Sequence, residues 1–95
     1  MVRADGFIKE LRQAEATGVW EDFHFLYLPN DHTGGPPSPR AQVADNDVSL
    51  GRVVEAITRS VFGSNTVIFV IEDDPQSGYD HVDAHRSICL VISPY

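Results

Sequence analysis

Cysteine, basic residues and long apolar runs are scarce in this chain. Its 95 residues include one cysteine, Cys89, which excludes an internal disulfide and lies in an apolar run, where it is expected to act as a small core side chain. No segment approaches the roughly 20 apolar residues that span a bilayer. Residues 1–6 contain no apolar signal core, so we expect no export signal here.

The charge balance narrows the classes of partner. Seven basic residues against 14 acidic ones give a formal charge of −7, which disfavours a nucleic-acid backbone or an anionic membrane surface. Hydrophobic residues make up 42% of the chain, a value typical of globular proteins. We therefore expect one small domain over residues 1–95, with a larger exposed fraction than a typical enzyme has.

Apolar spacing predicts two helices. The first begins at an Asp5 N-cap, runs to about Thr17 and ends at Gly18. Its apolar residues would share one face: Phe7, Ile8, Leu11 and Ala14. The second begins at the N-cap cluster 45–47 and ends before residues 63–65. Its apolar residues also recur at helical spacing: Val48, Leu50, Val53, Val54, Ile57 and Val61.

Aromatic and β-branched runs predict three strands, at residues 23–28, 66–71 and 87–93. Between the first strand and the second helix, residues 30–46 are expected to form a long loop of the kind that is usually functional or disordered.

The order helix–strand–helix–strand–strand predicts an α/β fold class. A strand–helix–strand unit with Val/Ile-rich strands normally makes a right-handed crossover, so the first two strands would pair in parallel. Two helices are too few to cover both faces of three buried strands. The pattern therefore fits one part of an α/β/α sandwich with a mostly parallel sheet.

Residues 72–86 concentrate groups that bind metals. Five carboxylates and two imidazoles fall within these fifteen residues, directly after the second predicted strand. Loops beyond strand ends line the crevice of an open α/β sheet, and mixed oxygen and imidazole donors suit Zn²⁺ or Mn²⁺. A solvated acidic turn would account for residues 72–74 but leaves His81 and His85 unexplained. The pattern favours a metal site.

A second pair of donors, Asp31 and His32, follows the first predicted strand. In a parallel pair both loops leave from one sheet edge, so this pair would lie near Asp73 and Asp74. With the donors of residues 80–85, the edge would carry enough ligands for two ions, an arrangement that stabilises attacking and leaving oxygens in phosphoryl displacement. The alternative is a turn held by Asx-type hydrogen bonds.

Other interpretations of this region stay open. Arg86 could bind a phosphate oxygen through its planar guanidinium or pair with a nearby carboxylate. An acidic calcium loop with a structural role would leave the imidazoles of His32, His81 and His85 unexplained, because Ca²⁺ takes oxygen ligands.

Four sequence blocks in a fixed order cover nearly the whole chain. They are residues 28–33, residues 44–47 with 50–55, residues 66–74, and residues 78–86 with 92–95. These blocks resemble a bacterial phosphoesterase family of the alkaline phosphatase superfamily, close to the phospholipase C and acid phosphatase type. The resemblance implies a divalent-metal hydrolase of phosphate esters on an α/β/α sandwich.

By position, the resemblance implies two groups of metal ligands. One metal would be held by residues from both loops: Asp31, His32 and His85. The other would be held by paired acids at a strand end: Asp73 and Asp74. Neighbouring groups could orient these ligands: Glu72, Asp80, His81 and Asp83. The ions would be zinc or manganese, and Arg86 would contact phosphate.

No catalytic nucleophile matches the resemblance. The nucleophilic Ser or Thr of the superfamily, and the acid that starts its metal site, belong to an N-terminal half that this chain does not match. We therefore expect the C-terminal portion of a catalytic domain, which supplies the metal-binding half and shows little turnover alone. The alternative is a non-catalytic metal-binding or oligomerising fragment of the same fold.

Three further expectations follow from this interpretation. An exposed sheet edge and uncovered apolar faces favour a homo-oligomer. The resemblance implies a periplasmic or envelope parent protein, while the phosphate-ester substrate stays open. Gly63 stands where the resemblance leads us to expect a bulky aromatic residue.

Overall fold

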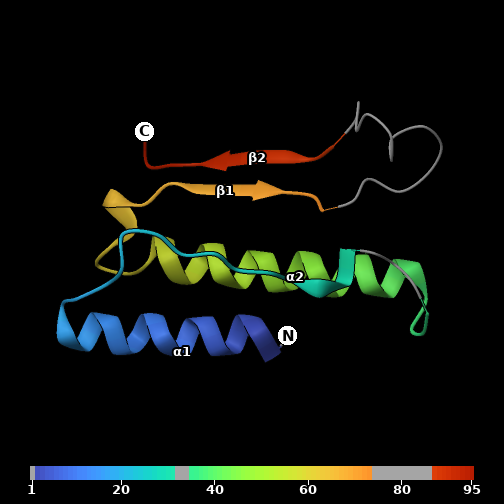
Figure 1. Ribbon diagram of the computed structural model, residues 1–95, viewed down its shortest axis with the longest axis horizontal. Coiled ribbons are helices and arrows are strands. Elements are labelled where there is room, and N and C mark those ends of the chain that lie inside the picture. The colour runs from blue at the N-terminus through green and yellow to red at the C-terminus, as the bar shows by residue number, and fades with distance from the viewer. Residues whose placement is uncertain (1, 32–34, 74–86) are drawn as a thin grey trace.

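The computed structural model describes residues 2–31, 35–73 and 87–95. Over these residues the chain forms α1 (Val2–Thr17), η1 (Pro29–Asp31), α2 (Pro39–Thr58), η2 (Gly63–Asn65), β1 (Ile68–Ile71) and β2 (Cys89–Ile92). The two η elements are short 3₁₀ helices. In Figure 1, α1 lies along α2, and α2 lies between α1 and the two strands. Within the described residues, no helix is long and apolar enough to cross a membrane.

The first predicted helix is confirmed, with an earlier start. α1 begins at Val2, so the predicted N-cap Asp5 lies inside its first turn, where its carboxylate forms a 2.6 Å ion pair with Arg52 of α2. Leu11, on the predicted apolar face, has no exposed surface. The helix ends at Gly18, whose φ of 73° is the left-handed conformation that glycine adopts without strain.

α2 begins earlier than the predicted cluster at residues 45–47. Ser38 is the N-cap, because its hydroxyl oxygen accepts a 3.3 Å hydrogen bond from the Ala41 N–H. Pro39 takes the first helical position, where a missing N–H leaves no bond unmade. The predicted loop over residues 30–46 is therefore wrong in its second part. The buried side chains of α2 are Gln42, Ser49, Val53, Ala56 and Ile57.

The hydrophobic core lies between α1 and α2. Its most buried members come from both helices: Ala4, Leu11, Val53, Ala56 and Ile57. Partly buried residues surround them: Phe7, Ile8, Trp20, Leu26, Phe62 and Ile68. The ring of Trp20 lies 4.5 Å from His24 and 4.9 Å from Phe62, measured between ring centroids. This aromatic contact closes the core where α1 ends.

Residues 23–28 are extended but do not form the predicted strand. The segment crosses α2 in the same direction as β1 (Figure 1), and none of its residues belongs to a strand. Alternate side chains point outward: Phe23 is 80% exposed and Phe25 is 82% exposed, whereas Leu26 packs on the core. The aromatic run favours extended backbone, but a strand also needs a neighbour that supplies N–H and C=O groups.

The predicted parallel sheet is contradicted. β1 and β2 pair antiparallel, with Ile68 opposite Ile92 and Ile71 opposite Cys89. Both helices lie on one side of this two-stranded sheet in Figure 1, so the described residues do not form an α/β/α sandwich. The predicted crossover required a strand at residues 23–28. In the structure residues 23–28 form no strand, and the last two strands pair with each other.

Gly63 explains the turn between α2 and β1. A Cβ atom at this position would lie 2.7 Å from the Ile57 carbonyl oxygen and 2.8 Å from that of Thr58. Real Cβ atoms do not approach backbone oxygens so closely. The expected bulky aromatic residue is therefore excluded by this backbone path.

Candidate functional site

Three of the predicted site residues belong to the described part of the chain: Asp31, Glu72 and Asp73. The others lie outside the described residues: His32, Asp74, Asp80, His81, Asp83, His85 and Arg86. Within residues 2–31, 35–73 and 87–95, no group of three or more His, Cys, Asp or Glu side chains could hold a metal ion. The structure does place the two segments that lead into the predicted site. The first is residues 23–31, which end with η1, and the second is residues 68–73, which contain β1.

These two segments end toward the same end of the molecule. Along the long axis in Figure 1, η1, which ends at Asp31, lies level with the end of β1, which leads to Glu72 and Asp73. The segment before η1 and β1 also run in the same direction. The sequence predicted this neighbourhood from parallel pairing. In the structure the two segment ends lie level along the long axis without that pairing, and their predicted closeness stays a prediction.

Glu72 closes the base of the β1–β2 hairpin. Its backbone N–H donates a 3.1 Å hydrogen bond to the Ile88 carbonyl oxygen. Its Oε2 accepts a 3.3 Å hydrogen bond from the Ile88 N–H. A carboxylate that accepts a backbone N–H is held in one orientation. Glu72 thus anchors the start of the acidic segment, and Asp73 beside it is exposed.

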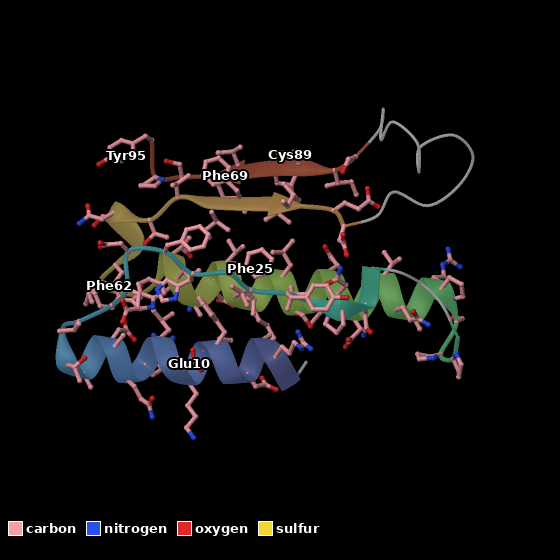
Figure 2. The ribbon with its side chains drawn as sticks, viewed as in Figure 1. Glu10, Phe25, Phe62, Phe69, Cys89 and Tyr95 are labelled. Atoms are coloured by element: carbon pink, nitrogen blue, oxygen red, sulfur yellow. The ribbon has the colours of Figure 1, made fainter. Side chains whose placement is uncertain are left out.

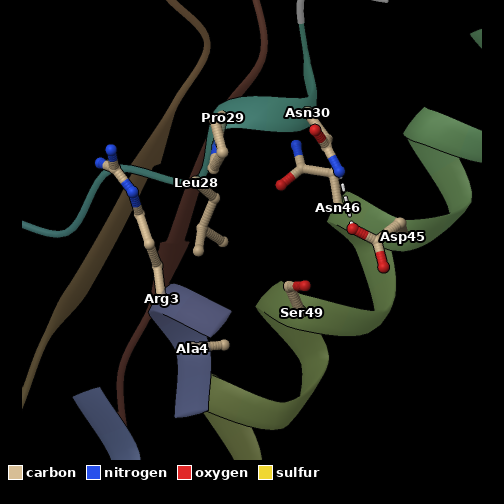
Figure 3. Close-up of a pocket in the computed structure, with 8 residues that line it drawn as sticks. All are labelled: Arg3, Ala4, Leu28, Pro29, Asn30, Asp45, Asn46 and Ser49. Atoms are coloured by element: carbon tan, nitrogen blue, oxygen red, sulfur yellow. Dashed lines mark hydrogen bonds between the residues drawn. The ribbon is translucent and has the colours of Figure 1, made fainter. Parts of the chain in front are cut away.

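η1 is fixed to α2 by a hydrogen bond between side chains. Asn30 Nδ2 donates to Asp45 Oδ2 across 2.7 Å (Figure 3). The sequence interpretation assigned Asp45 and Asn46 to a helix N-cap, whereas both lie inside α2 opposite η1. The sequence did contain a signal for a polar patch on this helix: its apolar face is interrupted at helical spacing by Asp45, Asn46 and Ser49.

A cavity of about 30 Å³ lies where α1, η1 and α2 meet (Figure 3). Ser49, which is 4% exposed, lies on its α2 side, and Leu28 and Ala4 supply apolar wall. The Oδ1 atom of Asn46 is buried and has no hydrogen-bond partner among the described residues. In Figure 3 the Asn46 amide points toward the space between Leu28 and Ser49.

Arg3 forms the outer boundary of this cavity. Its guanidinium carbon lies 5.0 Å from the centroid of the Tyr27 ring, within the range of a cation–π contact. Its Nη1 also donates a 3.5 Å hydrogen bond to the Tyr27 carbonyl oxygen. The positive charge is thereby held near the segment that enters η1.

A larger, open hollow of about 370 Å³ lies between the end of α2 and the sheet. Its lining includes Thr58, Ser64 and Thr66 but no ionisable side chain among the described residues. General acid–base chemistry needs a titratable group within hydrogen-bond reach. The hollow is therefore a weaker candidate than the end of the molecule where η1 and β1 terminate.

Comparison with known proteins gives no family assignment. No family model, no curated protein and no solved structure matches the chain.

Proposed function

We propose that this chain contributes metal ligands to a divalent-metal-dependent hydrolase of phosphate esters. The proposed ligands for Zn²⁺ or Mn²⁺ are Asp31, His32, Asp73, Asp74 and His85. One observation carries the proposal: the segments that end in Asp31 and Asp73, far apart in sequence, run in the same direction to the same end of the molecule.

The donor set fits such ions chemically. Carboxylate oxygens and imidazole nitrogens are ligands for Zn²⁺ and Mn²⁺, and a dense acidic segment supplies the negative charge that a dication requires. Two such ions in one site stabilise the attacking and leaving oxygens of a phosphoryl transfer. In this proposal Glu72 is a positioning residue, because its carboxylate already accepts the Ile88 N–H. No residue of the chain is assigned as nucleophile.

Calorimetric titration tests the metal site. The chain is stripped with a chelator and titrated with Zn²⁺ and with Mn²⁺, beside the variants Asp31→Ala and Asp73→Ala. We expect binding by the original chain, weakened at least about tenfold in each variant. The matched control is Asp47→Ala, which removes an exposed acid of α2 and should leave the affinity unchanged. Equal affinity in all four proteins, or no binding by the original chain, would refute the proposal.

Activity is a separate question with its own assay. We expect the purified chain alone to show little or no hydrolysis of aryl phosphate mono- and diesters, with or without added metal. Robust turnover that is lost in Asp74→Ala would contradict this expectation and would show that the chain carries its own nucleophile.

A second candidate function, self-association, is favoured by the exposed sheet. Neither strand contains a charged residue, and within the described residues both have an unpaired edge. Phe69 is 66% exposed, Ile71 70% and Val91 61%. In Figure 2, Phe69 lies on the sheet and Phe25 on the segment that crosses α2. Apolar surface of this kind marks an interaction face.

Light scattering after gel filtration tests this candidate. We expect a dimer or higher oligomer, shifted toward monomer by Phe69→Glu. The control is Val19→Glu, which adds the same charge at an exposed apolar residue outside the sheet. A monomer at high protein concentration would rule out self-association through this face.

A further inference from the structure

The cavity at the junction of α1, η1 and α2 contains an unmet hydrogen-bond requirement. Asn46 Oδ1 is buried without a donor from the described part of the chain. A buried acceptor without a partner destabilises a fold, so native proteins usually supply a donor from the protein or from ordered water. In Figure 3 the amide of Asn46 points into the cavity. With no donor from the described part of the chain, the remaining source is whatever fills this space.

The size of the cavity limits the occupant. Its volume of about 30 Å³ has room for one or two water molecules at roughly 10–15 Å³ each. Its lining combines polar side chains, including Asn46 and Ser49, with apolar wall from Leu28 and Ala4. A water molecule needs two to four polar partners, and this lining can provide them.

The charges around the cavity favour a neutral occupant. The Arg3 guanidinium disfavours a cation, and the Asp45 carboxylate disfavours an anion. The group without a partner is the carbonyl oxygen of Asn46, which needs a hydrogen-bond donor. An anion offers only acceptors and could not meet that need. Water is neutral and can donate.

We propose that an ordered water molecule occupies this cavity, donates to Asn46 Oδ1 and, with the Asn30–Asp45 hydrogen bond, fixes η1 on α2. Asn30, Asp45 and Asn46 then act as positioning residues for the last residue of η1, Asp31. That positioning role rests on the proposed metal site. The water and the Asn30–Asp45 hydrogen bond, called the clamp below, do not depend on it.

Nuclear magnetic resonance tests the water directly. We expect cross-peaks between a long-lived water and the side-chain amide protons of Asn46, and no such cross-peaks at Asn65, an exposed asparagine of η2. Absence of the water signal at Asn46 would overturn the proposal.

Unfolding equilibria give an independent readout. We expect Asn46→Leu to raise the unfolding equilibrium constant roughly two- to tenfold, because the bonds to the water are lost. The control Asn65→Leu should leave it nearly unchanged. If the cavity is empty, Asn46→Leu removes an unpaired acceptor and should lower that constant, which would contradict the proposal.

A double-mutant cycle tests the clamp between η1 and α2. Asn30→Ala, Asp45→Ala and the double variant should be non-additive, with a coupling of roughly two- to tenfold in the unfolding equilibrium constant. Additive effects would overturn the clamp. The cycle needs no metal, so it separates the clamp from the proposed function.

Metal titration of the same variants tests the link to Asp31. Neither Asn30 nor Asp45 is a proposed ligand, yet we expect each alanine variant to weaken Zn²⁺ binding about 10- to 100-fold. Unchanged affinity would refute the positioning role. If the original chain binds no metal while the water signal and the coupling are present, the proposed function fails and the clamp is upheld.

Discussion

The backbone N–H of Val61 donates a hydrogen bond to Glu15 Oε1 across 3.3 Å, which ties α1 to the turn after α2. The other carboxylate oxygen, Oε2, accepts from Arg12 within α1. The hydrogen bond from Arg12 holds the pKa of Glu15 below its ordinary value, against the raising effect of desolvation, and the Val61 N–H lowers the pKa further. One carboxylate thus joins a local helix contact to a contact between distant segments.

This pKa shift predicts a dependence of stability on pH. A carboxyl group whose folded pKa lies below its unfolded value stabilises the fold above the unfolded pKa, and that contribution is lost as the pH falls through the folded pKa. We expect Glu15→Gln to lower the Tm at neutral pH, with a difference that shrinks as the pH falls below 4.5. Thermal unfolding followed by circular dichroism measures both. Glu10→Gln, at an exposed position of α1, is the control. A difference that persists unchanged in acid would contradict the prediction.

The core prediction concerns Leu11. Its side chain is fully buried between the two long helices, so truncation leaves a cavity as well as losing apolar burial. We expect Leu11→Ala to lower the free energy of unfolding by about 2–5 kcal/mol. Urea unfolding followed by Trp20 fluorescence measures the change, because this residue packs on the same core. The control Lys9→Ala, on the exposed side of α1, should change it by less than about 0.5 kcal/mol.

Replacing glycine by alanine should change the free energy of unfolding in opposite directions at two positions, Gly63 and Gly51. Gly63→Ala would place a methyl group against two backbone oxygens and should destabilise the chain by about 1–3 kcal/mol. Gly51 lies inside α2, where an added methyl group would meet no atom within 4 Å, so Gly51→Ala should stabilise by about 0.5–1 kcal/mol. Chemical denaturation of both variants measures the difference, and equal effects at the two positions would refute it.

The start of α2 supplies a further test. Ser38→Ala removes the side chain that accepts from the Ala41 N–H and should lower the free energy of unfolding by about 0.5–2 kcal/mol. Ser64→Ala, at an exposed serine of η2, should have almost no effect. If both variants match the original chain, Ser38 does not cap the helix.

The sequence predicted the helices better than the sheet. The apolar spacing around Leu11 located α1, because a helix face depends on residues close in sequence. The start of α2 was missed because the acidic cluster at residues 45–47 looked like a cap, although Ser38-Pro39 carries the stronger signal. Residues 23–28 were assigned to a strand from their aromatic run, yet strand formation depends on a partner that local sequence does not specify.

The candidate site was predictable in part. The acidic segment and the Asp31–His32 pair are visible in the sequence because ligand-forming residues cluster there. The contact between Asn30 and Asp45 was not predictable, since it depends on how the chain turns back on α2. The sequence interpretation placed Glu72 beside metal ligands, which stays a prediction; its bond to Ile88 follows from the antiparallel hairpin, which that interpretation did not contain.

The bonds between Glu72 and Ile88 have a consequence for how this chain could evolve. They join the two ends of the intervening segment at the base of the hairpin. The entropy lost in closing a loop grows only with the logarithm of its length, by about 0.6 kcal/mol per doubling. Insertions and deletions between these two residues should therefore be tolerated. A shift in strand register, in contrast, would break the hydrogen bonds between Glu72 and Ile88. The length of this segment can therefore change without any change in the helical core.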